Sequence, residues 1–236
     1  MILFLKEKTK LSSQIYEFSF TNKDKFNFTP GQYLEWTVPH SNFDSRGVRR
    51  YFTISSSPTE SEIKLAVRVN ENSSSFKKTL LNLNEKQKIV ASGPYGDFTL
   101  PNEKNKKLVF IAGGIGVTPF RSIINSLLDK NEKRDIVFIY TCATKDAFVF
   151  KELFDKASKE LNIRVIYVLT DTKVVSKDWY GKIGRLTLEM LQEIPDYRKR
   201  IYYLSGPDAT VRSYKALVKS LGVSAKNIIT DYFSGY

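Results

Sequence analysis

A glycine-rich segment directly after a buried apolar run places the strongest constraint on this chain. Residues 108–111 are all apolar and lead into Ala-Gly-Gly-Ile-Gly-Val-Thr-Pro at 112–119, after which a helical pattern begins. A strand that turns through glycines into a helix brings free backbone N–H groups close to a bound phosphate. Thr118 suits the N-cap and Pro119 the first helical position. Because Pro119 replaces the third glycine of the usual dinucleotide motif, a tight turn without a ligand stays the alternative.

The composition excludes several classes of site. The chain has 236 residues, enough for two modest domains, and no apolar run approaches the ~20 residues of a membrane-spanning helix. One cysteine, Cys142, cannot form an intramolecular disulfide or a Cys-ligated metal site, so we expect a cytoplasmic location and no metal. The only histidine, His40, follows Pro39 in a polar turn and is a poor candidate for a nucleophile's base.

A formal net charge of +12 favours acidic partners in general. The lysines are scattered, however, and no nucleic-acid-binding motif accompanies them. We therefore interpret most of them as solvated surface residues and expect no nucleic-acid partner. A protein that binds nucleic acid through this charge is the alternative, and it would show salt-sensitive binding without a cofactor.

The two halves of the chain differ in how polar and apolar residues alternate. Residues 1–102 contain short runs of alternating polarity at 15–20, 33–38 and 63–69, which favour an antiparallel barrel or sandwich. Residues 103–236 alternate strand-like runs with helical patterns, which favours a parallel sheet covered on both faces. The expected strands of this half are 108–112, 135–141, 163–169, 201–204 and 228–231, and the clearest helices are 120–130 and 207–221. The polar stretch 101–105 marks the boundary.

Two segments of the first half carry groups that suit an anionic, flat ligand. Arg50 and Phe52 share one face of a strand at period two, so a guanidinium and an aromatic ring lie side by side. Ser74 and Ser75 stand at the start of a short helix with lysines close to that start, which suits a phosphate. An edge strand with a solvated arginine and an ordinary capped helix are the alternatives.

The order of these motifs resembles the ferredoxin–NADP reductase family over nearly the whole chain. The motifs are Arg50-x-Phe52-Thr53, Ser75 at a helix start, Gly93-Pro94-Tyr95-Gly96-Asp97-Phe98, Gly113-Gly114-x-Gly116-x-Thr118-Pro119, Ser205-Gly206-Pro207 and an aromatic tail. The resemblance implies an antiparallel six-stranded flavin-binding β-barrel in residues 1–102. It implies a Rossmann-like parallel α/β nucleotide-binding domain in residues 103–236.

The resemblance also implies roles in the first half. Arg50 would bind a flavin phosphate, Phe52 would pack on the isoalloxazine ring, and Thr53 would lie beside its reactive edge. Because the family usually has tyrosine in place of Phe52, a register shifted to Arg49 and Tyr51 is the alternative. The strand at Arg68 and Val69 would follow the ribityl and phosphate groups. The helix start, with Ser74, Ser75 and the backbone at Phe76, would hold the pyrophosphate.

In the second half, Gly114, Gly116 and Thr118 would hold the nicotinamide nucleotide's pyrophosphate. Ser205, Gly206 and Pro207 resemble the family's turn beside the nicotinamide, where cysteine is common in place of serine. Asp231-x-Phe233 resembles the acidic-x-aromatic ending of relatives. Phe233 would cover the flavin and move aside for the nicotinamide, with Tyr236 as the alternative cover. Thr53, Ser205 and Phe233 are thus the expected catalytic positions.

The implied activity is hydride transfer from NADPH or NADH to bound FAD, with FMN the less expected flavin. Electrons would then pass to a separate protein such as ferredoxin, flavodoxin or another redox partner. A flavin-binding electron-transfer or regulatory subunit without independent reductase activity is the alternative. The coenzyme stays open from the sequence, because Lys145 and Arg121 favour NADPH whereas Asp146 favours NADH.

Overall fold

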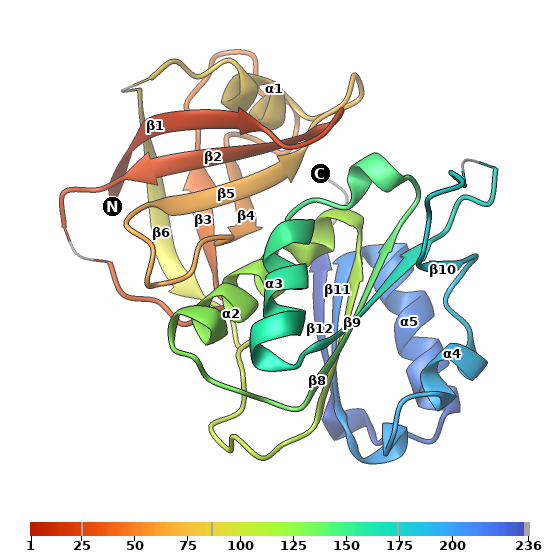
Figure 1. The fold of residues 1–236 in the computed structure, drawn as a ribbon. Coiled ribbons are helices and arrows are strands. Elements are labelled where there is room, and N and C mark those ends of the chain that lie inside the picture. The colour runs from red at the N-terminus through yellow and green to blue at the C-terminus, as the bar shows by residue number, and fades with distance from the viewer. Residues whose placement is uncertain (25, 86, 174, 234–236) are drawn as a thin grey trace.

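The chain folds into two bodies, each built on a six-stranded sheet (Figure 1). The computed structural model describes residues 1–236 except 25, 86, 174 and 234–236. The first sheet is antiparallel throughout, and the second is parallel throughout. The expected fold class, a barrel-like antiparallel sheet followed by a Rossmann-like parallel α/β unit, is therefore confirmed.

The first sheet has the strand order β4-β3-β6-β1-β2-β5. Its strands are β1 (Ile2–Lys10), β2 (Ile15–Thr21), β3 (Tyr33–Thr37), β4 (Arg49–Thr53), β5 (Ile63–Arg68) and β6 (Lys88–Tyr95). The strands curve around an apolar interior in which Trp36, Phe18 and Phe20 are fully buried. One short helix, α1 (Ser75–Leu81), closes one end by burying Phe76 and Leu80.

The second sheet has the strand order β10-β9-β8-β7-β11-β12. Its strands are β7 (Leu108–Gly113), β8 (Ile136–Cys142), β9 (Arg164–Leu169), β10 (Lys182–Ile183), β11 (Ile201–Pro207) and β12 (Ile228–Phe233). The helices are α2 (Thr118–Asp129), α3 (Lys151–Leu161), α4 (Leu188–Gln192) and α5 (Asp208–Ser220). The chain order reverses between β7 and β11, and ligands of open α/β sheets bind at the strand ends beside such a switch point.

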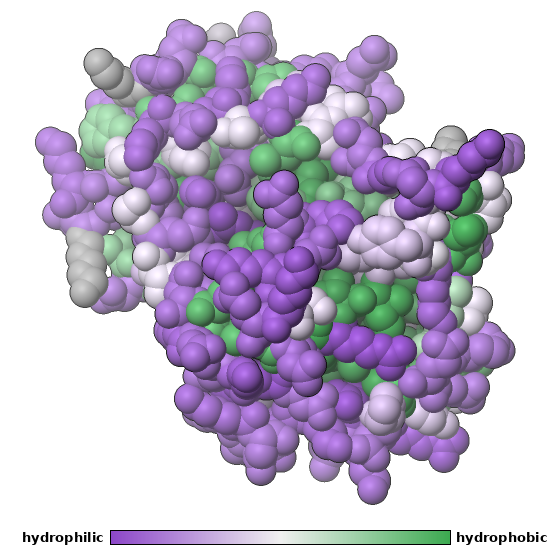
Figure 2. All heavy atoms as spheres, viewed as in Figure 1, coloured by the Kyte–Doolittle hydropathy of each residue, from purple (hydrophilic) through white to green (hydrophobic). Residues whose placement is uncertain are grey.

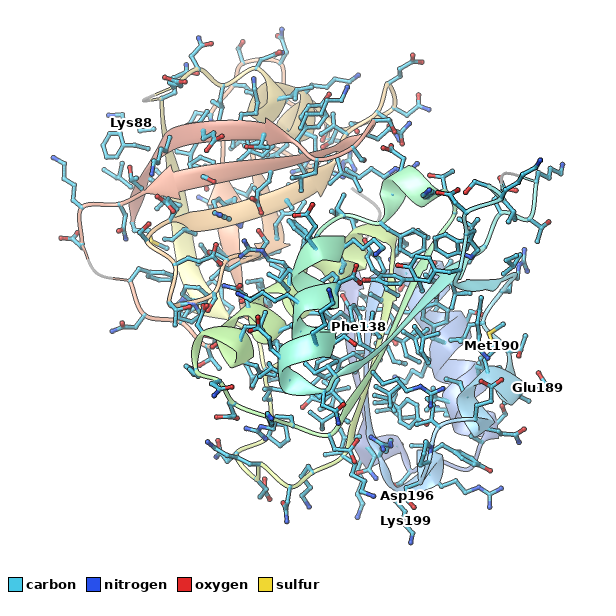
Figure 3. All side chains as sticks on the ribbon, viewed as in Figure 1. Lys88, Phe138, Glu189, Met190, Asp196 and Lys199 are labelled. Atoms are coloured by element: carbon cyan, nitrogen blue, oxygen red, sulfur yellow. The ribbon has the colours of Figure 1, made fainter. Side chains whose placement is uncertain are left out.

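Both faces of the second sheet are covered, as its continuous apolar strands require (Figure 1). Helices α2 and α3 lie on one face, where Phe138 of β8 packs edge-on against Phe154 at 4.9 Å between ring centroids (Figure 3). Helices α4 and α5 cover the other face through Leu191, Val211 and Val218. Hydrophilic residues cover most of the face shown in Figure 2, and hydrophobic residues show through in small separated areas.

A buried ion pair joins the two bodies. The Arg121 guanidinium, on α2, donates to both carboxylate oxygens of Glu60 and to the Ser55 carbonyl at 2.9 Å. The neighbouring Ser122 Oγ donates to the Ser56 carbonyl at 2.6 Å. Burial raises the pKa of Glu60, but the hydrogen bonds and charge of Arg121 outweigh it and leave that pKa below its ordinary value. The helix after the glycine-rich turn is thereby fixed to the loop between β4 and β5.

Local details differ from the sequence expectation for physical reasons. A 3₁₀ turn, η1 (Gly114–Val117), precedes α2, so Thr118 is the first helical residue instead of the cap, and its Oγ1 donates to the Ile115 carbonyl. Strand β6 continues through Tyr95 of the Gly93–Phe98 motif, because Tyr33 of β3 pairs with Tyr95. Three short 3₁₀ turns complete the described elements: η2 (Lys145–Ala147), η3 (Tyr197–Lys199) and η4 (Ala225–Asn227).

The helices in the described part of the chain are too short to cross a bilayer. The longest, α5, has 13 residues, whereas about 20 are needed.

The ion pair between the bodies predicts a stability effect. Glu60→Gln leaves the Arg121 guanidinium buried without its counter-charge, so we expect the unfolding free energy to fall by about 2–4 kcal/mol. Lys156→Ala, which removes an exposed pair with Glu160 on α3, is the control and should cost less than about 1 kcal/mol. Urea denaturation of the three proteins measures both values, and equal losses in the two variants would contradict the assignment.

Candidate functional site: two adjoining cavities between the sheets

The first cavity lies between the two bodies and has a volume of about 510 Å³, within the usual range of ligand pockets. The first sheet contributes three consecutive residues of β4, Tyr51, Phe52 and Thr53, together with Tyr33 and the end of β5. The second body contributes η1, the start of α2 and the ends of β11 and β12. The described lining residues from there are Ile115, Thr118, Pro207, Asp231, Tyr232 and Phe233.

Four cationic side chains gather at the end of this cavity near α1. Arg68 and Lys77 line the cavity, and Arg50 lies behind its wall with its guanidinium 5.6 Å from the Phe76 ring. Burial, together with the charges of Arg46, Arg68 and Arg50, lowers the pKa of Lys77 to about 8. Repulsion among these groups shows a local excess of positive charge, which suits a ligand with phosphate groups.

Arg50 is almost fully buried and is held by the loop that precedes β4. Its Nη1 donates to the carbonyls of Arg46, Gly47 and Arg49 at 2.6–2.9 Å, and its Nη2 donates to Asp44 Oδ1 at 3.0 Å. Arg49 is exposed and pairs with Glu35 at 3.4 Å instead. The two arginines of the motif therefore face opposite environments.

At the opposite end of the cavity, a carboxyl and two hydroxyl groups converge. Asp231 of β12 pairs with Ser205 of β11 in the sheet register, which places both side chains on one face, and Thr53 lies across from them on β4. Burial raises the pKa of Asp231 to about 6, although the Ser205 and Thr53 hydroxyls act in the opposite direction. This end of the cavity can therefore hold a proton near neutral pH.

The last described strand is oriented by helix α5. The Tyr232 ring lies 5.9 Å from both the Arg212 guanidinium and the Lys215 ammonium. Because side chains alternate along a strand, Asp231 and Phe233 face the other side. The alternative cover, Tyr236, lies outside the described residues.

The second cavity, of about 760 Å³, lies at the carboxyl ends of β7, β8, β9 and β11. It shares Arg68, Ile115 and Pro207 with the first, so the two cavities adjoin. Gly114 lines it at a φ of +53°, and a Cβ there would meet no other atom within 4 Å. The described polar lining residues are Ser12, Ser13, Gln14, Thr141, Thr144, Thr170, Arg185, Thr210, Ser213 and Tyr214.

Two other glycines serve backbone packing behind the cavities. A Cβ on Gly116 would come within 2.4 Å of the Ser205 carbonyl and the Gly206 Cα. Gly206, at a φ of +153°, in turn lies against the backbone of Gly113. These contacts hold η1 directly against the end of β11, and they place Gly116 behind the cavity wall instead of at its surface.

The residues singled out in the sequence divide into two groups. Those that line a cavity are Tyr51, Phe52, Thr53, Arg68, Gly114, Thr118, Pro207 and Phe233. Those that lie behind the lining are Arg50, Val69, Ser74, Ser75, Phe76, Gly116, Ser205 and Gly206. The Ser74 side chain caps α1 by accepting from the Lys77 N–H, so its hydroxyl has a structural partner.

Several lining residues were missed by sequence reasoning. Tyr33 is a neighbour of Thr53 in the β3–β4 register, so strand pairing contained its signal, whereas Lys77 is one of the lysines expected at the helix start. Asp231 was noticed only as part of a terminal motif. Arg185 stands in a loop after β10, and no local pattern marks it.

Two family models match consecutive parts of the chain. Residues 3–100 match the oxidoreductase FAD-binding domain, and residues 110–216 match the oxidoreductase NAD-binding domain. The first match spans the antiparallel sheet, and the second runs from β7 into α5, so β12 lies beyond both matches. The chain belongs to the ferredoxin–NADP reductase family. It accordingly carries an FAD-binding and an NAD-binding oxidoreductase domain, and the cationic cluster and the open Gly114 turn fit the phosphates of these two cofactors.

The chain is also similar to individual curated proteins. The chain is 24% identical over 238 residues to a flavohemoprotein of Bacillus cereus, covering 96% of this chain and 59% of the relative. It is 29% identical over 201 residues to the glycine betaine monooxygenase reductase subunit of Pseudomonas aeruginosa, covering 84% and 54%. The chain thus spans between one half and three fifths of the length of these curated relatives.

A solved structure shares the fold. The cytochrome P450 reductase of Amycolatopsis superposes with a TM-score of 0.85 at 22% identity, covering 99% of this chain and 70% of that one.

The raised pKa of Asp231 predicts a pH-dependent stability in the flavin-free chain. A carboxyl whose folded pKa lies above its ordinary 3.8 costs stability once it ionises, so the wild type loses stability as the pH rises from about 4 to above 6. Asp231→Asn removes this cost. We expect the variant to gain about 1–2 kcal/mol relative to the wild type between about pH 4.5 and 7.5 in urea denaturation. Parallel pH profiles would show that Asp231 is not buried as described.

Proposed function

We propose that the chain is a reductase module that moves a hydride from NAD(P)H to FAD and passes electrons on to a separate protein. The observation that carries this proposal is the pair of adjoining cavities, one with a cationic end and one at the glycine turn. We assign the flavin to residues 1–102 and the nicotinamide nucleotide to residues 103–236. When bound, FAD accepts a hydride and can release electrons one at a time.

We assign the isoalloxazine ring to the end of the first cavity formed by Phe52, Thr53 and Phe233. Phe52 packs against Phe76 at 5.6 Å between ring centroids, which fixes one aromatic wall. Phe233 supplies the opposing wall, because side chains alternate along β12 and the neighbouring Tyr232 faces α5. The buried position of Arg50 and the exposure of Arg49 support the register with Arg50 and Phe52 over the shifted one.

The flavin phosphates belong at the cationic end. Arg50, Arg68 and Lys77 supply charged groups there, and beside them the Ser75 N–H, at the start of α1, donates to Asp44 Oδ2 at 3.1 Å. At the other end, Thr53, Ser205 and Asp231 orient the nicotinamide and can hold a proton beside the reacting ring. The shared wall of Arg68, Ile115 and Pro207 brings the two ligands together without a moving domain.

We infer that NADPH is the preferred coenzyme. The three residues weighed from the sequence are engaged elsewhere: Arg121 with Glu60, Lys145 with Asp178, and Asp146 with the Ser13 N–H at 2.9 Å. The charged side chains among the described residues that line the nucleotide cavity are Arg68 and Arg185. An arginine favours a 2′-phosphate, whereas a carboxylate favours a free 2′-hydroxyl.

The electron acceptor is proposed by class. Relatives named as a reductase subunit and as a P450 reductase support delivery to a separate oxygenase or heme protein, besides ferredoxin or flavodoxin. The basic surface favours an acidic partner.

Anaerobic titration of the FAD-loaded chain with each coenzyme tests the function. We expect NADPH to bleach the flavin absorbance at lower concentration than NADH, and Arg185→Gln to reduce this preference by about tenfold because it removes one phosphate contact. Lys145→Gln, which changes an exposed charge outside the cavity lining, is the control and should leave the preference intact. Bound flavin that neither coenzyme reduces would instead favour an electron-transfer or regulatory subunit.

The glycine turn predicts a selective loss of coenzyme binding. Gly114→Ala places a methyl group in the nucleotide cavity, so we expect the apparent coenzyme Kd to rise at least tenfold while the flavin stays bound. Gly222→Ala is the control. Gly222 also has a positive φ, +82°, and a Cβ there would meet no other atom within 4 Å, but it follows α5 and does not line the nucleotide cavity. If both variants changed coenzyme affinity equally, backbone strain and not phosphate contact would explain the loss.

A further inference from the structure

Asp44 holds several of the groups that a phosphate of the flavin would need. Its Oδ1 accepts from Arg50 Nη2 and from the Arg46 N–H, both at 3.0 Å. Its Oδ2 accepts from Arg46 Nη2 at 3.0 Å and from the Ser75 N–H at 3.1 Å. The Asp44 N–H in turn donates to Ser75 Oγ at 3.0 Å. One carboxylate thus joins the loop before β4 to Arg50 and to the start of α1.

The charges around this carboxylate are unbalanced. Arg46 and Arg50 form ion pairs with Asp44. Burial lowers the pKa of the nearby Lys77, and the charges of Arg46, Arg68 and Arg50 lower it further. Hydrogen bonds from Arg46 and the Ser75 N–H hold the pKa of Asp44 well below its ordinary value. Asp44 therefore stays ionised at every physiological pH and offsets only part of this positive cluster.

We propose that Asp44 is an internal stand-in for a flavin phosphate, and that it must give up Arg50 and the Ser75 N–H before the cofactor's phosphate group can bind. The inference rests on the proposed flavin site. A phosphate oxygen and the Asp44 carboxylate need the same donors and carry charge of the same sign, so both cannot occupy them.

The geometry also explains why Arg50 lies behind the cavity wall. Its guanidinium is directed toward Asp44 and toward three carbonyls of the same loop, all within residues 44–49. This arrangement keeps the buried guanidinium paired, because an uncompensated buried charge is costly. Residues 41–43, directly before Asp44, are exposed, and Asp44 itself is only partly buried.

The test compares flavins that differ in phosphate content. Asp44→Asn keeps the size of the side chain but removes its charge, so it competes less well for Arg50. We expect FAD to bind the flavin-free full-length chain about tenfold more tightly, whereas riboflavin, which has no phosphate, binds with unchanged affinity. Fluorescence titration with both flavins gives the two dissociation constants. ADP, which carries the pyrophosphate without the isoalloxazine ring, should follow FAD.

Two further variants separate this role from general charge effects. Glu71→Gln removes an exposed negative charge from the β5–α1 loop, and its FAD affinity should stay near that of the wild type. Asp44→Glu retains the charge and should restore most of the competition.

The outcomes are distinct. If FAD binds but Asp44→Asn weakens it or leaves it unchanged, Asp44 supports the site or is indifferent to it, and the proposal is overturned. An equal gain for FAD and riboflavin would equally overturn it, because the effect would not depend on phosphate. If no flavin binds to wild type or variant, the proposed flavin function itself fails.

Discussion

The two cavities share a wall because one buried arginine of the second body is anchored in the first. Arg121 stands at the beginning of α2, one turn after the glycine segment, and its partners lie in the loop that follows β4. Thr53, at the end of β4, and Thr118, at the start of α2, both line the first cavity. The ion pair therefore holds β4 close to the glycine turn, and the proposed hydride transfer requires this distance to be short and fixed.

The basic composition conceals an uneven distribution of charge. Many lysines are solvated, but two partly buried carboxyl groups have definite positions: Glu60 joins the two bodies, and Asp231 lies where a reacting ring is proposed. Arg121 lowers the pKa of Glu60, whereas burial raises the pKa of Asp231 and the Ser205 and Thr53 hydroxyls offset only part of that effect. The Glu60 carboxyl is thus ionised where it joins the two bodies. The Asp231 carboxyl can carry a proton near neutral pH, at the place where the chemistry is proposed.

Strand periodicity and motif order were sufficient to predict both sheets and the glycine turn, because these depend on local sequence. Long-range contacts were not predictable in the same way. Arg121 looked like a coenzyme ligand on its position alone, yet its partner is 61 residues away. Gly116 looked like a phosphate contact, but it allows two backbones to meet. Arg185 reaches its cavity through the placement of a loop, and Tyr33 reaches its cavity through the pairing of β3 with β4. Local sequence patterns reveal neither.

The two ends of the proposed flavin site differ in how they are held. Thr53, Ser205 and Asp231 stand on paired strands, and the contact of Gly116 with Gly206 fixes β11 against η1. The phosphate end depends on the loop of Asp44, whose carboxylate can be exchanged for another anion. A rigid ring site beside an exchangeable phosphate site lets the cofactor enter without disturbing the reacting geometry. The free energy of phosphate binding is then partly offset by the loss of Asp44, so cofactor affinity can be tuned there independently of the catalytic residues.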